Sequence, residues 1–448
     1  EYLSMTVLQT FKLPAEEARM KNRWAVAAAG TVVMICLGTV YSWSLFTEPL
    51  IASFNWTSAT TTWTFSVAIF FLGIGAIIGG RWQDQGGPRP VAVTGAILWG
   101  IGNILAGLGT ARFGALWIYL TYGLLGGLGL GLAYITPVAA VTKWFPDRRG
   151  LGGGIVIMGF GLGAFIYNWI LKSLPAYTTV AKHAADVIKS RKTANVIAMD
   201  AHDINVIMTT LMISGAIYLV VGGLCALYLS NPPQSGAPAT PAASSRAGFF
   251  TPIEAAKTWQ FFCLWMMLFL NVTAGILFIS NAVPIMRELT RVEPAKAASV
   301  YGLIALFNGI GRFFWGAISD LIGRNGAYIL IYGSQVAIFF TVGHLHSVAA
   351  VAMLFAIVLL CYGGGFGTMP SFTADYFGTK FIGLIYGWIL LAWGVAGVVG
   401  PIFVAYVKDH TGSFTGALPV IAIMLIVATI FPIIVRKPAP KEFARVSS

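Results

Sequence analysis

Long apolar runs, separated by short polar connections, occupy almost the whole chain. A helix needs about twenty apolar residues to cross the hydrocarbon core of a bilayer. On this criterion the sequence predicts twelve membrane-spanning helices, at residues 24–46, 60–82, 90–109, 114–139, 150–171, 205–229, 259–284, 297–319, 326–345, 349–371, 383–407 and 415–435. Because the number of spans is even, both chain ends are expected on the same side of the membrane.

A single Pro/Ser/Ala-rich segment, residues 230–258, divides the spans into two groups of six. Such segments form flexible linkers, so we expect two six-helix bundles, at residues 24–229 and 259–435. Residues 1–23 and 436–448 are expected to be cytoplasmic tails. A second span rather than a cleavage site follows the first span, so we expect the first span to be retained and not removed as a signal peptide.

The two predicted halves carry a related sequence after their second span. Residues 80–90 read GRWQDQGGPRP and residues 316–326 read GAISDLIGRNG. Asp84 and Asp320 are 236 positions apart, and each lies four residues after one glycine and three before another. Parallel repeats of this kind are typical of transporters that rock about a central site. The sequence therefore predicts an all-α polytopic membrane protein with twelve transmembrane helices in two pseudo-symmetric six-helix halves.

The composition agrees with a membrane protein and excludes an ordinary soluble domain. Of the 448 residues, 57% are hydrophobic and 10% are charged, whereas soluble domains contain about 25% charged residues. The formal charge of +12 comes mostly from basic residues in the connections. With both ends inside, the inner segments hold 17 of these residues and the outer loops hold 10. This bias predicts cytoplasmic termini in a plasma (cell inner) membrane, and we assign the charge to orientation rather than to nucleic acid.

The long outer connection, residues 172–203, contains half of the outer basic residues. It also contains five residues of metal-ligating types: His183, Asp186, Asp200, His202 and Asp203. Their spacing matches no known metal site, so we expect an amphipathic surface segment or a gate. The four cysteines lie within predicted spans and suggest neither a disulfide nor a metal motif. Because the sequence contains no nucleotide-binding motif and no catalytic triad, no cofactor and no enzymatic activity are expected.

The eighth predicted span contains a single basic residue, Arg312. A charge inside a bilayer costs free energy, so such a residue by default marks a functional site. Asn308 precedes Arg312 by four residues and therefore lies on the same helix face. The guanidinium offers a planar set of donors that matches a carboxylate, while Asn308 either contacts the ligand or packs between helices. The span therefore predicts an anion site that faces a cavity between the halves.

In these features the chain resembles the major facilitator superfamily. The loop motif of that family, Gly-x-x-x-Asp-x-x-Gly-Arg-Arg/Lys, is matched in part by Gly80, Asp84, Gly87 and Arg89, and better by Gly316, Asp320, Gly323 and Arg324. In the first copy, Pro88 and Arg89 stand where two basic residues are usual. The resemblance implies an intracellular gate in which acidic side chains cap helix ends or pair with basic residues. Its expected members are Asp84, Arg89, Asp320 and Arg324.

Within that superfamily the chain resembles the oxalate/formate antiporter family, which is related to the monocarboxylate transporters. The supporting features are Gly38-x-x-Tyr41-Ser42-Trp43-Ser44, KWFPDRRG at residues 143–150, Asn308-Gly309-x-Gly311-Arg312-x-x-Trp315-Gly316-x-x-Ser319-Asp320, and Phe377-Gly378. The resemblance implies a small carboxylate anion as the ligand. It also implies a set of substrate-binding residues: Arg312, Asn308, Tyr41, Tyr134, Tyr362, Phe366 and Trp393. Tyrosine hydroxyls donate to carboxylates, and packing against other helices or lipid is the alternative for each ring.

One position departs from the oxalate exchanger, which carries a lysine in the eleventh span where this chain has Trp393. Without a second cation, a dicarboxylate would bring an uncompensated charge into a low-dielectric site. We therefore predict a secondary transporter of small monocarboxylates, such as lactate, pyruvate or formate, that works by alternating access as a monomer. The alternatives are a dicarboxylate exchanger, an anion channel and a non-transporting carboxylate sensor.

The sequence does not determine whether transport is coupled to protons or to the exchange of anions. The candidate titrating residues Glu48, His344, His346 and Asp375 all lie at the ends of predicted spans. Proton symport usually requires a titrating group in the transport pathway. Proton symport and anion exchange therefore both remain open at this point.

Overall fold

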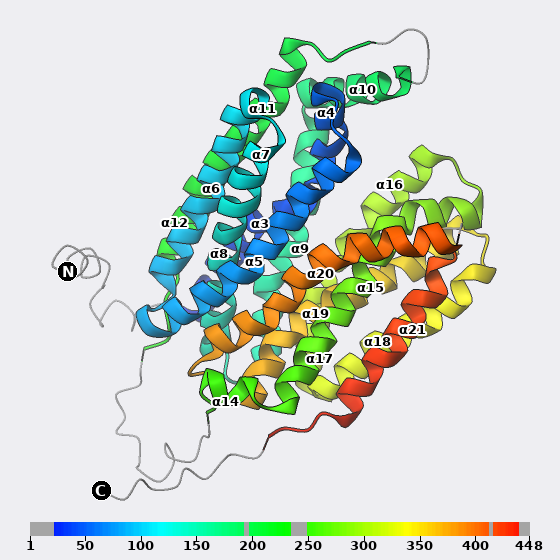
Figure 1. Ribbon diagram of the computed structural model, residues 1–448. Helices are drawn as coiled ribbons and strands as arrows, with labels where there is room; N and C mark the ends of the chain where they lie inside the picture. The colour runs from blue at the N-terminus through cyan, green and yellow to red at the C-terminus, as the bar shows by residue number, and fades with distance from the viewer. Residues whose placement is uncertain (1–21, 192–196, 234–248, 412–414, 439–448) are drawn as a thin grey trace, which may run out of the picture.

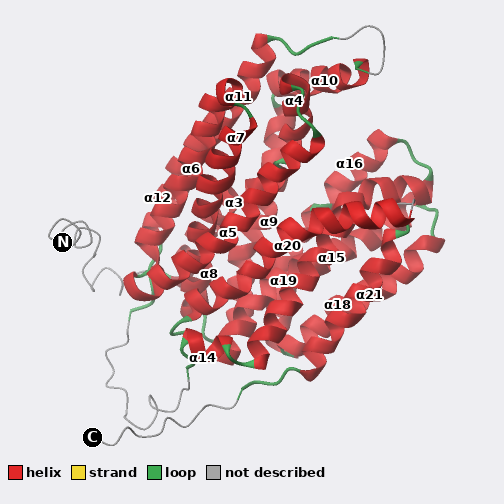
Figure 2. Ribbon diagram, viewed as in Figure 1, coloured by secondary structure: helices red, strands yellow, loops and turns green. Residues whose placement is uncertain are grey.

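The computed structural model of the protein describes residues 22–191, 197–233, 249–411 and 415–438. Figure 1 shows two groups of helices, one formed by the N-terminal part of the chain and one by the C-terminal part. Figure 2 shows only helices and connecting loops in the described part of the chain. Helices are expected for a chain in lipid, because a helix satisfies its own backbone N–H and C=O groups.

In the described residues, the first group contains ten α-helices. They are α3 (Arg23–Gly38), α4 (Ser44–Phe54), α5 (Ser58–Gly86), α6 (Pro88–Phe113), α7 (Ala115–Ile118), α8 (Gly127–Trp144), α9 (Arg149–Ser173), α10 (Pro175–Ser190), α11 (Ala201–Ile217) and α12 (Gly223–Tyr228). The second group contains α14 (Pro252–Ala256), α15 (Trp259–Thr290), α16 (Pro294–Ile304), α17 (Leu306–Ile322), α18 (Arg324–Thr341), α19 (Val348–Phe377), α20 (Ile382–Thr411) and α21 (Ala417–Ile434).

These helices account for the twelve predicted spans. Among the described residues, eleven helices are long and apolar enough to cross a membrane, and the shorter helix Leu418–Ile434 lies at the twelfth predicted span. The predicted all-α fold with twelve transmembrane helices is therefore confirmed. Four spans are interrupted: the first by the 3₁₀ turn η1 (Thr39–Ser42), the fourth and sixth by the π-helical stretches η2 (Tyr119–Gly126) and η3 (Tyr218–Gly222), and the eighth at Ala305.

The repeated loop motif has the same backbone conformation in both halves. Gly87, which joins α5 to α6, has a φ of 83°, and Gly323, which joins α17 to α18, has a φ of 82°. Glycine adopts such left-handed angles without the steric cost that a Cβ atom imposes. The sequence repeat therefore corresponds to a structural repeat, with one such turn in each half.

The two groups of helices touch along the pairs α5–α20 and α9–α17. Glycines allow this contact: a Cβ atom on Gly150 of α9 would lie 2.0 Å from the carbonyl oxygen of Gly316 of α17. In the other pair, a Cβ atom on Gly80 would lie 2.2 Å from the carbonyl oxygen of Gly383. Both positions therefore require glycine for the backbones to approach this closely.

The contact between α9 and α17 starts at one end of the molecule and reaches its middle. It extends from Gly150–Gly316 to Gly161, where an added Cβ atom would lie 2.4 Å from the Cα atom of Gly309. We call the end that carries Asp84 and Asp320 the latch end, and the opposite end the α10 end. Figure 1 shows the two groups diverging toward the α10 end, near α10 and α16.

Candidate functional site

Arg312 lies in the middle of the molecule, on α17, and its side chain is fully buried. Its guanidinium carbon lies 5.2 Å from the ring centre of Phe160 and 4.8 Å from that of Phe366. None of its three guanidinium nitrogens has a hydrogen-bond partner among the described residues. The aromatic faces compensate only part of the cost of burying a cation, because a cation–π contact contributes about 0.5–2 kcal/mol. The site therefore presents an uncompensated positive charge to whatever enters it.

Aromatic rings from both groups of helices surround Arg312, and we call them the aromatic cage. The ring centres of neighbouring members are 4.9–6.0 Å apart, and most of these pairs meet edge to face. The cage consists of Tyr41, Tyr134, Phe160, Tyr362, Phe366 and Trp393. The structure thus brings all five sequence-predicted aromatic residues to Arg312, together with Phe160, which was not predicted.

Tyrosine hydroxyls face the guanidinium. Those of Tyr41 and Tyr134 lie close to the Arg312 side chain, but neither makes a hydrogen bond of normal geometry to a described residue. Tyr386 on α20, which was not predicted from the sequence, lies seven residues before Trp393 in the direction of the latch end, and its buried hydroxyl has no hydrogen bond of normal geometry to a described residue. Arg312 and the hydroxyls of Tyr41 and Tyr134 therefore make a buried site that is complementary to an anion with oxygen acceptors.

Two glycines of α19 fix the position of α17. A Cβ atom on Gly367 would lie 2.0 Å from the carbonyl oxygen of Arg312, and one on Gly363 would lie 2.0 Å from that of Asn308. The two contacts are one helical turn apart on each helix, so α17 is held against α19 along the stretch that carries Arg312. The side-chain oxygen of Asn308 is buried without a hydrogen-bond partner among the described residues. Its side chain therefore stays available either to a ligand or to Arg312.

Trp393, which the resemblance relates to a lysine of the oxalate exchanger, is a buried ring of the cage. Its side chain is 1% exposed, and its ring contacts those of Tyr134, Phe160 and Phe366 at centre distances of 5.5, 5.4 and 4.9 Å. The described members of the cage therefore contain one charged neighbour, Arg312, and no second basic group.

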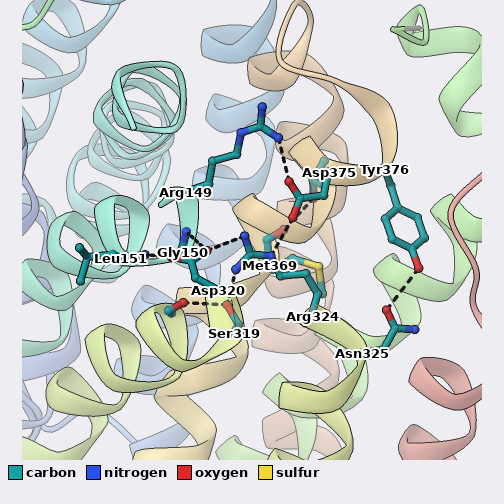
Figure 3. A network of polar contacts seen from close by, with 12 residues as sticks. Arg149, Gly150, Leu151, Ser319, Asp320, Arg324, Asn325, Met369, Asp375 and Tyr376 are labelled. Atoms are coloured by element: carbon teal, nitrogen blue, oxygen red, sulfur yellow. Dashed lines mark hydrogen bonds and ion pairs between the residues drawn. The ribbon is translucent and has the colours of Figure 1, made fainter. Parts of the chain in front are cut away.

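At the latch end, Asp320 of the second group caps a helix of the first group. Its two carboxylate oxygens accept hydrogen bonds from the backbone N–H groups of Gly150 (2.9 Å) and Leu151 (2.8 Å) at the start of α9. Figure 3 shows this contact. A carboxylate at a helix N-terminus is favoured both by the unpaired N–H groups and by the helix dipole.

Asp84 makes the reciprocal contact from the first group to the second. Its carboxylate accepts hydrogen bonds from the N–H groups of Gly383 (3.2 Å) and Leu384 (2.9 Å) at the start of α20. Lys143 lies 3.8 Å from the same carboxylate. We call the Asp84 and Asp320 contacts the two latches. They follow the sequence repeat, because each motif aspartate binds the helix start of the opposite half.

Ion pairs reinforce the Asp320 latch. Asp375 accepts hydrogen bonds from Arg149 of the opposite half and from Arg324, each at 2.8 Å (Figure 3). Arg324 also lies 2.7 Å from Asp320. Arg324, a predicted gate residue, therefore belongs to this group of ion pairs, together with Asp375 and Arg149, which the motif alone did not identify.

Arg89 is different, because it makes no ion pair with a described residue. It follows Asp84 by five positions rather than four, since Pro88 occupies the position that corresponds to Arg324 in the second repeat. Arg324 forms its pair with Asp320 at the helical spacing of four residues. Lys143 supplies the positive charge beside Asp84 instead.

The long connection between α9 and α11 forms the helix α10. Its buried residues recur at intervals of three and four and give the amphipathic helix that the sequence predicted. The Tyr177 hydroxyl donates to the carbonyl of Leu45 at 2.7 Å, and Arg191 donates to the carbonyl of Ala52 at 3.0 Å. These bonds attach α10 to α4, the helix that follows the first span.

The metal-ligating residue types in this connection do not form a cluster. His183 pairs with Asp203 at 2.5 Å, and Asp203 also takes part in the N-terminal capping box of α11 with Asp200. Among the described residues, no group of three His, Cys, Asp or Glu side chains is arranged to hold a metal ion. In the described structure His183 and Asp203 therefore serve local helix capping and packing.

The end of the segment between the two groups is docked onto the second group. The N–H of Phe250 donates to the carbonyl of Phe377 at 3.0 Å, and the two rings meet edge to face at 5.6 Å. Lys380 lies 4.1 Å from the ring centre of Phe249. We call this contact the linker clamp, and it holds the loop between α19 and α20.

Comparisons with known proteins agree with this architecture. A sequence model of the Major Facilitator Superfamily matches residues 28–401. The oxalate:formate antiporter of Oxalobacter formigenes is 28% identical over 89% of this chain and 88% of its own length. Monocarboxylate transporter 13 of Bos taurus is 24% identical over 88% of this chain and 84% of its own length. The solved structure of the E. coli fucose:proton symporter, FucP, superimposes with a TM-score of 0.65 at 17% identity, over 91% of this chain and 97% of that chain.

Proposed function

Because the chain belongs to the major facilitator superfamily, we propose that it is a secondary active transporter of small monocarboxylate anions. The observation that carries this proposal is the fully buried Arg312, whose guanidinium has no acceptor among the described residues. A buried cation of this kind is stabilised when an anion enters and forms hydrogen bonds with it. The similarity to the oxalate:formate antiporter supports a carboxylate as that anion.

The charge of the site favours one carboxylate per ligand. Arg312 neutralises a monocarboxylate one to one, whereas a dicarboxylate would keep a second charge beside Trp393. Desolvating an unpaired carboxylate costs several kcal/mol in an apolar site. Lactate, pyruvate and formate are therefore the proposed substrates, and Tyr41, Tyr134, Tyr362, Phe366 and Asn308 complete the proposed binding site.

The two latches support an alternating-access cycle. The cage contains residues of both halves, and both latches are closed in this structure. We assign the latch end to the cytoplasm, so that the described conformation is closed toward the cytoplasm. Release to that side requires Asp84 and Asp320 to leave the starts of α20 and α9. The bound anion favours the change between the two open states only if it binds more tightly to the intermediate state, in which both sides are closed.

Transport by proteoliposomes that contain the purified protein tests the proposal. We expect uptake of labelled lactate, pyruvate or formate in exchange for internal carboxylate, and its loss in Arg312→Lys, because an ammonium cannot replace the planar guanidinium. Arg112→Lys is the matched control, since Arg112 is an exposed arginine at the end of α6. Uptake that is unchanged in Arg312→Lys would refute the assignment.

The same preparation separates the alternatives. Strong competition by oxalate would favour a dicarboxylate exchanger. Ligand binding without exchange would favour a sensor, and unitary currents in planar bilayers would favour a channel. Stimulation of uptake by an imposed pH gradient identifies proton symport, whereas a requirement for internal anion identifies exchange.

A further inference from the structure

Buried threonines and serines in helices normally donate to a backbone carbonyl three or four residues earlier. Thr373 of α19 follows this rule, since its hydroxyl donates to the carbonyl of Met369 at 2.9 Å. Thr368 and Ser371 of the same helix do not. Both are fully buried, and neither hydroxyl has a hydrogen-bond partner among the described residues. A buried hydroxyl without a hydrogen-bond partner costs free energy of folding. A ligand that accepts hydrogen bonds from these two hydroxyls would offset that cost.

The two hydroxyls lie between the aromatic cage and the latch end. Along α19 the order is Phe366 in the cage, then Thr368 and Ser371, and then Asp375 at the ion pairs of the latch end. With a rise of about 1.5 Å per residue, the whole stretch spans about 13 Å. Thr368, Ser371 and Asp375 are three and four residues apart, so they share one face of the helix.

This face of α19 points toward the interface between the two groups of helices. The hydroxyl of Ser371 lies 3.8 Å from the position that a Cβ atom on Gly153 would take. Gly153 belongs to α9 of the opposite half and has no side chain that would separate the two helices. When the latches open, Ser371 of α19 and the backbone of α9 at Gly153 therefore line the interface at this level.

Tyr386 of α20 also lies between a latch and the aromatic cage along its helix. It lies three residues after Gly383, which binds Asp84, and seven residues before Trp393 of the cage. Its side chain is fully buried, and its hydroxyl has no hydrogen-bond partner among the described residues. The hydroxyl lies close to that of Tyr134 in the cage, so it joins this level to the cage.

We propose that Thr368, Ser371 and Tyr386 form a second, inner site that receives the carboxylate when it leaves Arg312 toward the latch end. This inference rests on the proposed transport function. The three hydroxyls are neutral donors, so they bind a carboxylate more weakly than the guanidinium does and allow it to move on. Beyond them, the next cations, Arg149 and Arg324, are already paired with Asp375.

The double variant Thr368→Val/Ser371→Ala tests the inner site. Pyruvate counterflow in proteoliposomes should become at least about tenfold slower, because two donors to the carboxylate are lost along the path and the loss of one hydrogen bond to a charged group already corresponds to about tenfold. The dissociation constant of pyruvate, measured on purified protein, should stay within about twofold, because the Arg312 site is intact. Thr373→Val is the matched control, since this buried hydroxyl of the same helix already has a partner, and it should change neither quantity.

Tyr386→Phe provides a second test that keeps the side-chain volume. It should also slow counterflow at a nearly unchanged dissociation constant. Its control is Tyr332→Phe, which removes a buried hydroxyl that donates to the carbonyl of Met267 at 2.7 Å. Should the double variant fail to fold, the Tyr386 and Tyr332 pair decides the question.

Two results would overturn the inner site while leaving the proposed function standing. One is a counterflow rate within twofold of the wild type in both Thr368→Val/Ser371→Ala and Tyr386→Phe. The other is a loss of pyruvate affinity as large as that of Arg312→Lys, which would make the hydroxyls part of the Arg312 site. Absence of counterflow in the wild type would instead refute the proposed function itself, and the inner site with it.

Discussion

Replacing Arg312 by methionine should make the ligand-free protein more stable and abolish ligand binding. Methionine has a similar length but no charge, and it keeps contact with the rings of Phe160 and Phe366. In the wild type the guanidinium is fully buried without an acceptor among the described residues. The substitution thus removes a buried charge that has no hydrogen-bond acceptor among the described residues.

The magnitude follows from two opposing contributions. Replacing buried ionic groups by apolar residues of similar volume is neutral or stabilises proteins by about 1–4 kcal/mol. Loss of the two cation–π contacts, at centre distances of 5.2 and 4.8 Å, removes about 0.5–2 kcal/mol each, which methionine recovers in part through sulfur–aromatic contacts. The first two contributions are of similar size, so the recovered sulfur–aromatic contacts leave a net gain of about 1 kcal/mol, which is seen as a rise of a few degrees in the melting temperature.

Thermal unfolding of the purified protein in detergent, with and without pyruvate, measures both effects. The melting temperature of the wild-type protein should rise with the pyruvate concentration, because pyruvate binds the folded state. Arg312→Met should have a higher melting temperature than the wild type without pyruvate, and pyruvate should not change it. Arg112→Met, at an exposed arginine, is the control for a general effect of lost charge. A lower melting temperature in Arg312→Met would refute the reasoning, because it would mean that the protein itself satisfies the guanidinium.

Three further substitutions test separate parts of the structure. Trp393→Lys should raise the affinity for oxalate relative to pyruvate in competition binding, at the expense of thermal stability, because it adds a second cation where a buried ring now packs. Asp320→Asn should weaken its latch by about 1–3 kcal/mol, so that a cysteine placed at Ser371 reacts faster with a thiol reagent added at the latch end. Gly150→Ala should block latch closure and abolish transport by the folded protein, because its Cβ atom would lie 2.0 Å from the carbonyl oxygen of Gly316. Unchanged oxalate selectivity, unchanged cysteine reactivity or normal transport, respectively, would contradict these expectations.

The spans and the central cation were predictable from the sequence, because both depend on one-dimensional information. Lipid demands about twenty apolar residues per span, and Arg312 stands out as a lone basic residue in such a run. The cage members Tyr41, Tyr134 and Trp393 come from three different spans, and only the family resemblance related them to Arg312 before the structure brought them together.

Other site residues left no distinctive trace in the sequence. Phe160 is one of many phenylalanines in apolar runs, and its place beside the guanidinium depends on the glycine contacts between α9 and α17. Asp375 appeared only as the end of a span, because its partners Arg149 and Arg324 come from elements far away along the chain. The free hydroxyls of Thr368, Ser371 and Tyr386 can be recognised only when every neighbouring acceptor is known.

The linker clamp has a consequence for how the chain can be divided. Phe250 is bonded to Phe377, and Lys380 lies over Phe249, so the second half begins structurally before its first span. A cut within residues 234–248 keeps Phe249 and Phe250 on the same fragment as their partners Phe377 and Lys380. A cut just before Trp259 would instead leave Phe249 and Phe250 on the N-terminal fragment and so separate them from the loop that leads to α20. Two separately expressed fragments that end and begin within 234–248 should therefore reassemble, and this interval is the place to insert a reporter domain or to encode the protein as two genes.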